Sequence, residues 1–160
     1  MNINDEIKAA IDFIGSYVKK FDIEISKPPS DRKELKADMK IDYSLGDLTR
    51  TGDYILGALE LRINTELFNE EGSIAVCKLR YLGLFRTGKN TPEETFKHML
   101  ELNGVMILYQ LSRSLIISIT AQAGLFPPLT LPLINIHKVI EKKKGANLPE
   151  KPDTSSDPRK

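Results

Sequence analysis

Four segments of the chain alternate apolar and polar side chains, the pattern of a β-strand with one face buried and the other in water. They are YVKKFDIEI from Tyr17, MKIDY from Met39, YILGALELRIN from Tyr54 and IAVCKLRYLGLF from Ile74. Three intervening stretches, KPPSDRKE, SLGDLTRTGD and NTELFNEEG, are rich in turn-forming residues, so we interpret them as turns or loops. Short connections favour an antiparallel meander or a Greek key.

After Gly88 the apolar period changes from two to about 3.6, which indicates helices. Residues 91–94, Thr-Pro-Glu-Glu, form a capping-box pattern, so we expect a helix to start there. Asn103 and Gly104 are expected to interrupt it. A second, longer helix is predicted over residues 105–123, ended by the glycine that follows. Asn135 is expected to cap a last, short helix that ends near Lys144.

The length of 160 residues fits one domain, which we place at residues 1–144. Residues 145–160 contain three prolines and one large apolar side chain, Leu148, so we expect a disordered tail. The formal net charge of +1 gives no overall attraction to nucleic acid or to anionic lipid. We therefore predict no nucleic-acid partner.

The long predicted helix carries apolar residues in nearly every direction, although a helix on a sheet needs only one apolar stripe. We predict that a second subunit covers the surplus face in a symmetric oligomer. The interface residues proposed are Leu108, Leu111, Leu115 and Ile119. The alternative is that these side chains pack under the tail or the loops.

The same helix does not have the composition of a membrane span, because Arg113 near its centre would cost about 2.5 to 3.5 kcal/mol in an inserted helix. The start of the sequence, MNINDEIKAAIDFIG, lacks the pattern of a secretory signal. We therefore expect a cytoplasmic protein with no membrane insertion.

The polar residues form no recognisable catalytic or metal-binding set. His98, His137 and Cys77 do not have the spacing of metal ligands. None of the common nucleophile, phosphate-loop, dinucleotide or zinc-protease motifs is present. We interpret Cys77 as a small buried apolar residue in a reducing compartment. The prediction is a protein that is not an enzyme and has no cofactor.

The uncharged stretch GLFPPLTLPLINI, residues 124–136, is unusually apolar for a connection between two helices. A groove lined by such residues would bind extended, apolar polypeptide with little sequence choice. This composition favours a chaperone over an enzyme.

Several motifs resemble those of the protein-export chaperone SecB family. They are Arg113 followed by Gly124, the FPPL turn at residues 126–129 and the PLINI run at residues 132–136. Upstream, the Gly-Leu-Phe of residues 83–85 and the segment from Tyr17 to Glu24 are similar to strands of that family. The spacing from Arg113 to the Phe-Pro pair is one residue longer than in the usual pattern.

The resemblance implies an α+β fold: a four-stranded antiparallel Greek-key sheet packed with a long helix and a short C-terminal helix. It also implies a tetramer built as a dimer of dimers, and an ATP-independent holdase that keeps unfolded clients competent for export. The implied client-binding groove consists of Met39, Ile41, Tyr43, Phe126, Leu129, Leu131, Leu133, Ile136 and Ile140. Each of these could equally belong to an ordinary core.

Members of this family dock on the SecA export motor through acids on the outer face of the sheet. By position, Glu24 and Val76 are the implied docking residues, whereas Lys20 and Lys78 stand where the family carries acids. This reversal of charge favours an alternative, a SecB-like chaperone dedicated to one partner such as the antitoxin of a toxin–antitoxin system. A third hypothesis is a structural or ligand-binding module that shares only the fold.

Overall fold

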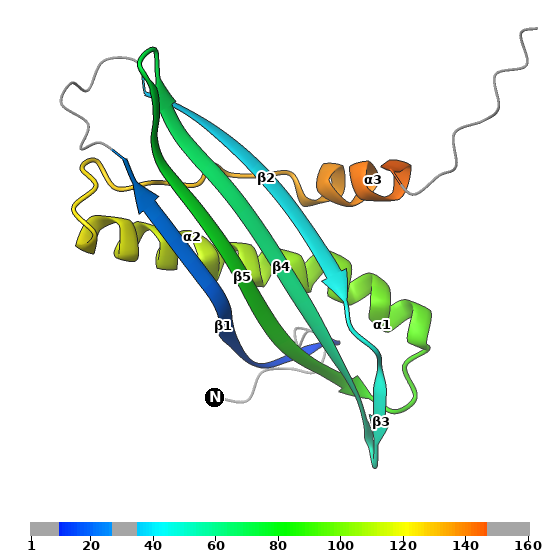
Figure 1. Ribbon diagram of the computed structural model, residues 1–160. Coiled ribbons are helices and arrows are strands. Elements are labelled where there is room, and N and C mark those ends of the chain that lie inside the picture. Colours follow the sequence, from blue (N-terminus) through cyan, green and yellow to red (C-terminus); the bar gives the residue numbers. More distant parts are fainter. Residues whose placement is uncertain (1–9, 27–34, 147–160) are drawn as a thin grey trace, which may run out of the picture.

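The computed structural model describes residues 10–26 and 35–146 of the chain (Figure 1). Five strands precede the helices. Their bounds are β1 Asp12–Ile25, β2 Lys36–Leu45, β3 Thr49–Thr51, β4 Tyr54–Asn69 and β5 Gly72–Gly88. The predicted KPPSDRKE loop lies outside the described residues.

The strands form one antiparallel sheet in the order β1-β5-β4-β2, with the short β3 paired to β4. Counting the four long strands, the first lies beside the last, which is a Greek-key order. The predicted fold class, an antiparallel sheet with a long and a short helix, is confirmed. The short β3 adds a fifth strand to the four expected.

Two segments interpreted as loops are partly strand. In NTELFNEEG, β4 continues to Asn69, because Thr65 and Leu67 point into the core and keep the period of two. Glu66, between them, faces outward. Because Thr65 is itself polar, the alternation of apolar and polar residues is not visible in the sequence there. In SLGDLTRTGD, residues 49–51 form β3 against the start of β4. The sheet is therefore longer than predicted.

The helices are α1 Glu93–Met99, α2 Val105–Gln122 and α3 Ile136–Ala146. The predicted break at Asn103 and Gly104 is wrong, because a π-helical turn, Leu100–Gly104, joins α1 to α2 without interruption. Gly104 is buried there, and a side chain on it would meet Phe85 at 3.4 Å. This is an ordinary van der Waals distance, and the glycine does not end the helix.

The predicted capping box does not form. The Thr91 hydroxyl lies 2.9 Å from that of Thr87 at the end of β5, and the Glu94 carboxylate accepts a hydrogen bond from Lys97 at 2.8 Å. Both side chains thus have other partners, and the helix begins after Pro92 without a side-chain cap. The predicted cap of the last helix does form, since the Asn135 side-chain oxygen accepts from the backbone N–H of Lys138 at 3.3 Å.

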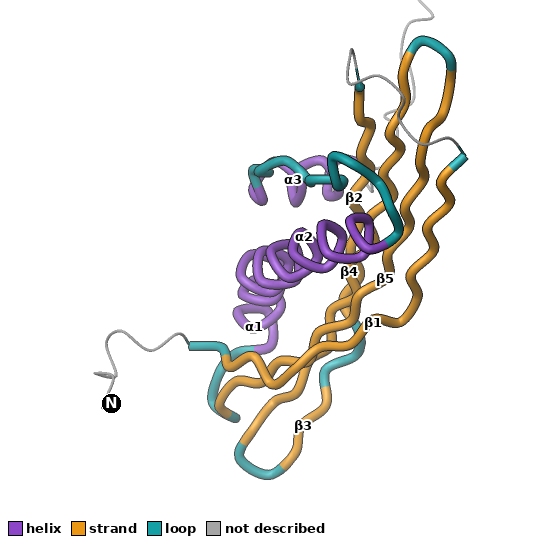
Figure 2. The backbone as a smooth tube through the Cα atoms, turned by 90° about the vertical axis from the view of Figure 1, so that its left-hand side faces the viewer, coloured by secondary structure: helices purple, strands orange, loops and turns teal. Residues whose placement is uncertain are grey.

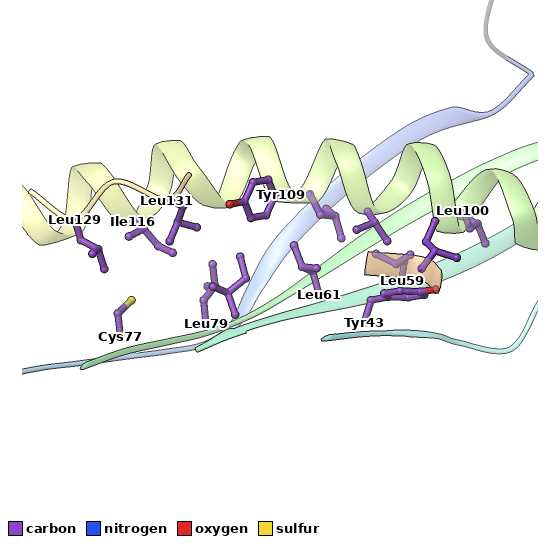
Figure 3. Close-up of a cluster of buried hydrophobic side chains, with 14 of the residues drawn as sticks. Tyr43, Leu59, Leu61, Cys77, Leu79, Leu100, Tyr109, Ile116, Leu129 and Leu131 are labelled. Carbon is purple, nitrogen blue, oxygen red and sulfur yellow. The ribbon is translucent and has the colours of Figure 1, made fainter. Parts of the chain in front are cut away.

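The three helices lie on one face of the sheet, and the other face is left uncovered by them (Figure 2). The core lies between the sheet and α2 (Figure 3). Side chains of α2 and of the linker after it, such as Ile116 and Leu131, face Cys77 and Leu79 of β5. The face of the sheet that carries the helices is therefore the apolar one, as the strand pattern predicts.

The continuous helical run from Glu93 to Gln122 is long and apolar enough to cross a membrane by length and composition alone. Core helices of globular proteins pass the same test. Here one stripe of α2 packs on the sheet, with Leu108, Tyr109 and Ile116 almost fully buried. Packing within the chain therefore accounts for that apolar stripe.

The last helix ends at Ala146, two residues beyond the predicted boundary at residue 144. The remainder of the predicted tail lies outside the described residues.

Candidate functional site

The linker between α2 and α3 runs back along α2 and is fixed to it by three polar side chains. The Tyr109 hydroxyl donates to the carbonyl of Pro132 at 2.6 Å, and Nε of Arg113 donates to the carbonyl of Leu131 at 3.0 Å. The Thr120 hydroxyl accepts from the backbone N–H of Leu129 at 3.0 Å. Burial raises the pKa of the Tyr109 hydroxyl, so it stays a donor at neutral pH.

These bonds explain why Arg113 lies in an otherwise apolar helix. A linker with three prolines cannot join a regular ladder, and its backbone carbonyls need donors when they lie against a core. Arg113 supplies one of these donors and is half-buried as a result. Its role in the described chain is to position the linker.

The apolar side chains of the linker divide into two groups. Leu125, Leu129 and Leu131 are buried in the core, whereas Phe126 and Leu133 are 65% and 77% exposed. The stretch is therefore partly core and partly apolar surface. Exposed apolar side chains of this size are the part that requires a functional explanation.

A hollow of about 530 Å³ lies between the edge strand β2 and helix α3. Its apolar wall consists of Met39, Ile41 and Tyr43 from β2, Ile134 from the end of the linker and Val139 from α3. We call this hollow the β2–α3 groove. Its rim carries Lys40, Asp42, Lys142, Lys143 and Ala146.

Lysines at the end of α3 attach the helix to β2 and to the π-helical turn. The ammonium group of Lys143 lies 2.5 Å from the Asp42 carboxylate, donates to the carbonyl of Tyr43 and lies 4.7 Å from the centre of the Tyr43 ring. Lys144 pairs with Glu101 at 3.2 Å, and the Tyr43 hydroxyl donates to that same carboxylate at 3.2 Å. These contacts fix the position of α3 beside β2, and with it the width of the groove.

The charges of this cluster follow from their surroundings. Burial, together with the nearby Glu101 carboxylate, raises the pKa of Tyr43, so its hydroxyl remains protonated and donates to Glu101. Burial alone would raise the pKa of Asp42, but the hydrogen bond and charge of Lys143 outweigh it and the pKa is lowered. At neutral pH the Tyr43 hydroxyl is therefore protonated and the Asp42 carboxylate is charged, and in these states both groups take part in the contacts that hold α3 in place.

The structure brings together only part of the predicted groove. Met39, Ile41 and Tyr43 line the β2–α3 groove, although Tyr43 is only 2% exposed. Three other predicted residues are core residues in the single chain, because each is at most 6% exposed: Leu129, Leu131 and Ile140. Ile136 is half-buried against the core.

The remaining predicted groove residues, Phe126 and Leu133, are exposed on the linker and are not among the residues that line this hollow. The sequence reasoning missed Ile134 and Val139, which do line it. Val139 precedes Ile140 on the short helix. Because the Ile140 side chain packs in the core, the Val139 side chain faces the groove.

The predicted oligomer residues differ in their exposure. Leu108 is fully buried and packs against Gly83 of the sheet, so its side chain is not at the surface. Leu111 is 37% exposed, and Leu115 and Ile119 are half-buried. Met106, which was not predicted, is 46% exposed on the same helix. A surface strip of α2 thus remains for the predicted interface.

The predicted motor-docking residues face each other across the pair β1 and β5. Glu24 is exposed and Val76 is half-buried, on the face of the sheet that carries no helix. They therefore lie on the opposite side of the sheet from the β2–α3 groove.

Within residues 10–26 and 35–146, no group of three or more His, Cys, Asp or Glu side chains is placed to hold a metal ion. Cys77 is buried, and burial raises the pKa of its thiol to about 11. The thiol is therefore uncharged at neutral pH and a poor nucleophile. The arrangement in the described residues offers apolar contact and hydrogen bonding.

The Greek-key sheet with a long helix across one face and a short last helix is the arrangement that the resemblance to the SecB family implies. The family profile described as "Preprotein translocase subunit SecB" matches residues 4–147, and the chain belongs to this family. The resemblance drawn from the motifs is thereby confirmed.

Two protein-export proteins SecB are similar in sequence. The one from Anaplasma phagocytophilum is 33% identical over 89 residues, which cover 54% of this chain and 56% of that protein. The one from Neorickettsia sennetsu is 39% identical over 77 residues, covering 48% of this chain and 46% of that protein. The chain spans about half the length of the curated relatives it matches.

A solved structure shares the fold. It is a SecB-like chaperone from Mycobacterium tuberculosis, in complex with a peptide from an antitoxin, with a TM-score of 0.65 and 16% sequence identity. The match covers 79% of this chain and 91% of that one.

Proposed function

We propose that this chain is an ATP-independent holdase, which binds non-native polypeptides in the β2–α3 groove and keeps them competent for export. The observation that carries the proposal is the groove itself, whose wall is apolar and whose rim is charged. Its volume of about 530 Å³ is in the range of pockets that take an apolar ligand. Folded proteins would not bind, because their apolar segments are already buried.

Binding of this kind needs neither nucleotide nor another cofactor, since it exchanges apolar surface of the client for that of the groove. One groove covers only a few client side chains, so its affinity is modest. Several grooves on one oligomer would bind a long client tightly through effective concentration. The proposal therefore includes a homo-oligomer, a tetramer in the form of a dimer of dimers, acting in the cytoplasm.

The test is suppression of aggregation of an unfolded test client, such as reduced α-lactalbumin, by stoichiometric amounts of the protein. Val139→Asp places a charge in the groove wall and should weaken suppression by about tenfold or more, since burying an unpaired carboxylate costs more than 1.4 kcal/mol. Leu133→Asp is the matched control, because Leu133 is 77% exposed and does not line the groove.

Equal loss in both variants would place client binding on the linker as well as in the groove. No suppression by the unchanged protein at all would refute the holdase and leave only the fold.

A second candidate is a chaperone dedicated to one partner, such as the antitoxin of a toxin–antitoxin system. Lys20 and Lys78 on the open face favour it, because they replace acids that would attract the SecA motor. The SecB-like structure from Mycobacterium tuberculosis, which is in complex with an antitoxin peptide, supports this candidate.

Affinity capture of the tagged protein from its own cytoplasm separates the two candidates. Many unrelated precursors with signal peptides, with or without the SecA motor on Glu24 and Val76, are expected for the export holdase. One small stoichiometric partner is expected for the dedicated chaperone.

A further inference from the structure

The face of the sheet opposite the helices carries two neighbouring cross-strand rows of charged residues. Directly paired residues form each row, which runs from β1 across β5 and β4 to β2. The first row is Asp22, Lys78, Asn64 and Lys40, and the second is Lys20, Arg80, Arg62 and Asp42. Five cations and two acids thus lie close together, an excess of three positive charges.

The cations of these rows are unequally satisfied. Lys20 pairs with Asp22, Arg62 with Asp42, and Arg80 with Glu60. By contrast, Lys40 and Lys78 are exposed and make no ion pair or side-chain hydrogen bond within the described part of the chain. Two positive charges of one row, on either side of Asn64, are therefore available to a partner.

Arg62 adds a third donor. Its Nε is buried and has no hydrogen-bond partner among the described residues. A buried donor left without a partner costs about 1 to 3 kcal/mol. Because that atom has no exposed surface, a partner carboxylate would meet it only after the Arg62 side chain, which is 39% exposed, turns outward and offers Nε and Nη2 together.

The surface is also hollowed at these residues. One hollow of about 160 Å³ is lined by both rows, and a second of about 190 Å³ lies beside it. The two share Asn64 and Lys78, so they form one trough across the strands. The trough gives a partner side chain a place between the two rows, with the Asn64 amide as a further hydrogen-bonding group.

We propose that this trough, centred on Lys78, Arg62 and Lys40, binds an acidic polypeptide segment of a partner protein. Most of the trough lies on the opposite side of the sheet from the β2–α3 groove, and of the residues that line it only Lys40 also lines the groove. A client in the groove and this segment can therefore be bound together. The proposal does not rest on the holdase function.

The pattern of charges selects a polypeptide over a nucleic acid. The next row towards the end of the sheet is Glu24, Val76, Glu66 and Asp38, which holds three acids. Neighbouring positions on one face of a strand are about 6.6 to 6.8 Å apart. A nucleic-acid strand repeats a negative charge along its whole length, so any phosphate that lies against the acidic row would be repelled. A peptide can place acidic side chains on the two rows rich in cations and a basic side chain on the acidic row.

The test measures the affinity of labelled decaglutamate by fluorescence anisotropy. It compares the unchanged full chain with the double variant Lys40→Glu, Lys78→Glu. We expect binding that weakens with added salt, and a loss of about tenfold or more in the double variant. The double variant Lys36→Glu, Lys138→Glu is the matched control. It changes the same total charge at exposed lysines outside the trough, and should change affinity less than about twofold.

Circular dichroism should show that Lys40→Glu, Lys78→Glu is folded. Suppression of client aggregation should be unchanged in the single variant Lys78→Glu, because Lys78 does not line the β2–α3 groove. Absence of decaglutamate binding, or equal loss in the two double variants, would overturn the proposal. The proposal would also be overturned if a DNA oligonucleotide of equal length bound as tightly as the peptide and its binding were lost in Lys40→Glu, Lys78→Glu. The trough would then be a phosphate site.

Discussion

Glu60 lies on the open face of the sheet, where two cations converge on its carboxylate. Arg80 donates from Nε at 2.9 Å and from Nη2 at 3.1 Å, and Lys19 donates from Nζ at 3.0 Å. The hydrogen bonds from Arg80, followed by the contribution of Lys19, lower the pKa of Glu60 from 4.5 to about 2 against an opposing effect of burial. These contacts link β4 to β5 and β1.

This shift predicts an acid-dependent loss of stability. The pKa of Glu60 is lower in the folded chain than in the unfolded chain, so its contribution is present above about pH 4.5 and is lost as the pH falls towards 2. Glu60→Gln should lower the denaturant midpoint at neutral pH, and the difference from the unchanged protein should shrink below pH 4.5. A control is Glu66→Gln, at an exposed carboxylate on the same strand. A difference that is independent of pH would contradict this account.

Gly83 is a position where the sheet and α2 approach closely. A Cβ there would lie 2.8 Å from Cδ2 of Leu108 and 2.8 Å from Cε2 of Phe85, both in the buried core. Gly83→Ala should therefore destabilise the fold by about 1 to 3 kcal/mol, measured by chemical denaturation. Gly15→Ala is the control, because no atom lies within 4 Å of a Cβ at that glycine. Equal stability of both variants would show that α2 can shift without cost.

Individual groove residues were predictable only where a regular period applies. Met39 and Ile41 follow from the alternation along β2, and they line the groove. The linker has no period, so nothing in the sequence separates buried Leu131 from exposed Leu133. Their difference in burial depends on Arg113, which lies in α2, 18 residues before Leu131 in the sequence, and donates a hydrogen bond to the Leu131 carbonyl.

Helix α3 is attached by charged side chains as well as by apolar ones, of which Ile140 is buried and Ile136 and Val139 are half-buried against the core. Replacing both lysines in Lys143→Gln, Lys144→Gln removes the pairs with Asp42 and Glu101. Partly exposed ion pairs contribute up to about 1 kcal/mol each, so amide hydrogen exchange in α3 should become about threefold to thirtyfold faster.

Exchange in β4 and β5 should not change, because those strands form the centre of the sheet. Lys97→Gln, which breaks a pair within α1, is the control and should leave α3 unaffected. If α3 exchanges at the same rate in all variants, its apolar contacts alone hold the groove open.

At the level of helices and strands, the change of period after β5 was a sufficient signal for the order of elements. Local cap signals were less reliable. The Thr91 and Glu94 side chains fit a capping box in the sequence, but tertiary contacts with Thr87 and a neighbouring pair with Lys97 use them first. The length of β4 was underestimated because Glu66 is polar on the outward face and Thr65 is a polar residue in the core.

The whole molecule has a covered and an uncovered side of the sheet, and an apolar strip along one edge of α2. Leu111 is 37% exposed on this strip, and Leu115 and Ile119 are half-buried. We predict that this strip joins subunits, so Leu111→Asp should shift the protein to a smaller species in light scattering coupled to gel filtration. Gln110→Asp, at the exposed neighbour, is the control. An unchanged mass in Leu111→Asp would place the interface elsewhere.

The position of the client is the point on which the function depends. A photo-crosslinking amino acid at Val139, in the wall of the β2–α3 groove, should cross-link an unfolded client through the client's apolar segments. The same group at Leu133 should give far fewer cross-links, although it is more exposed. Cross-links mainly from Leu133, with none from Val139, would contradict the account, because the client would then lie on the linker and not in the groove.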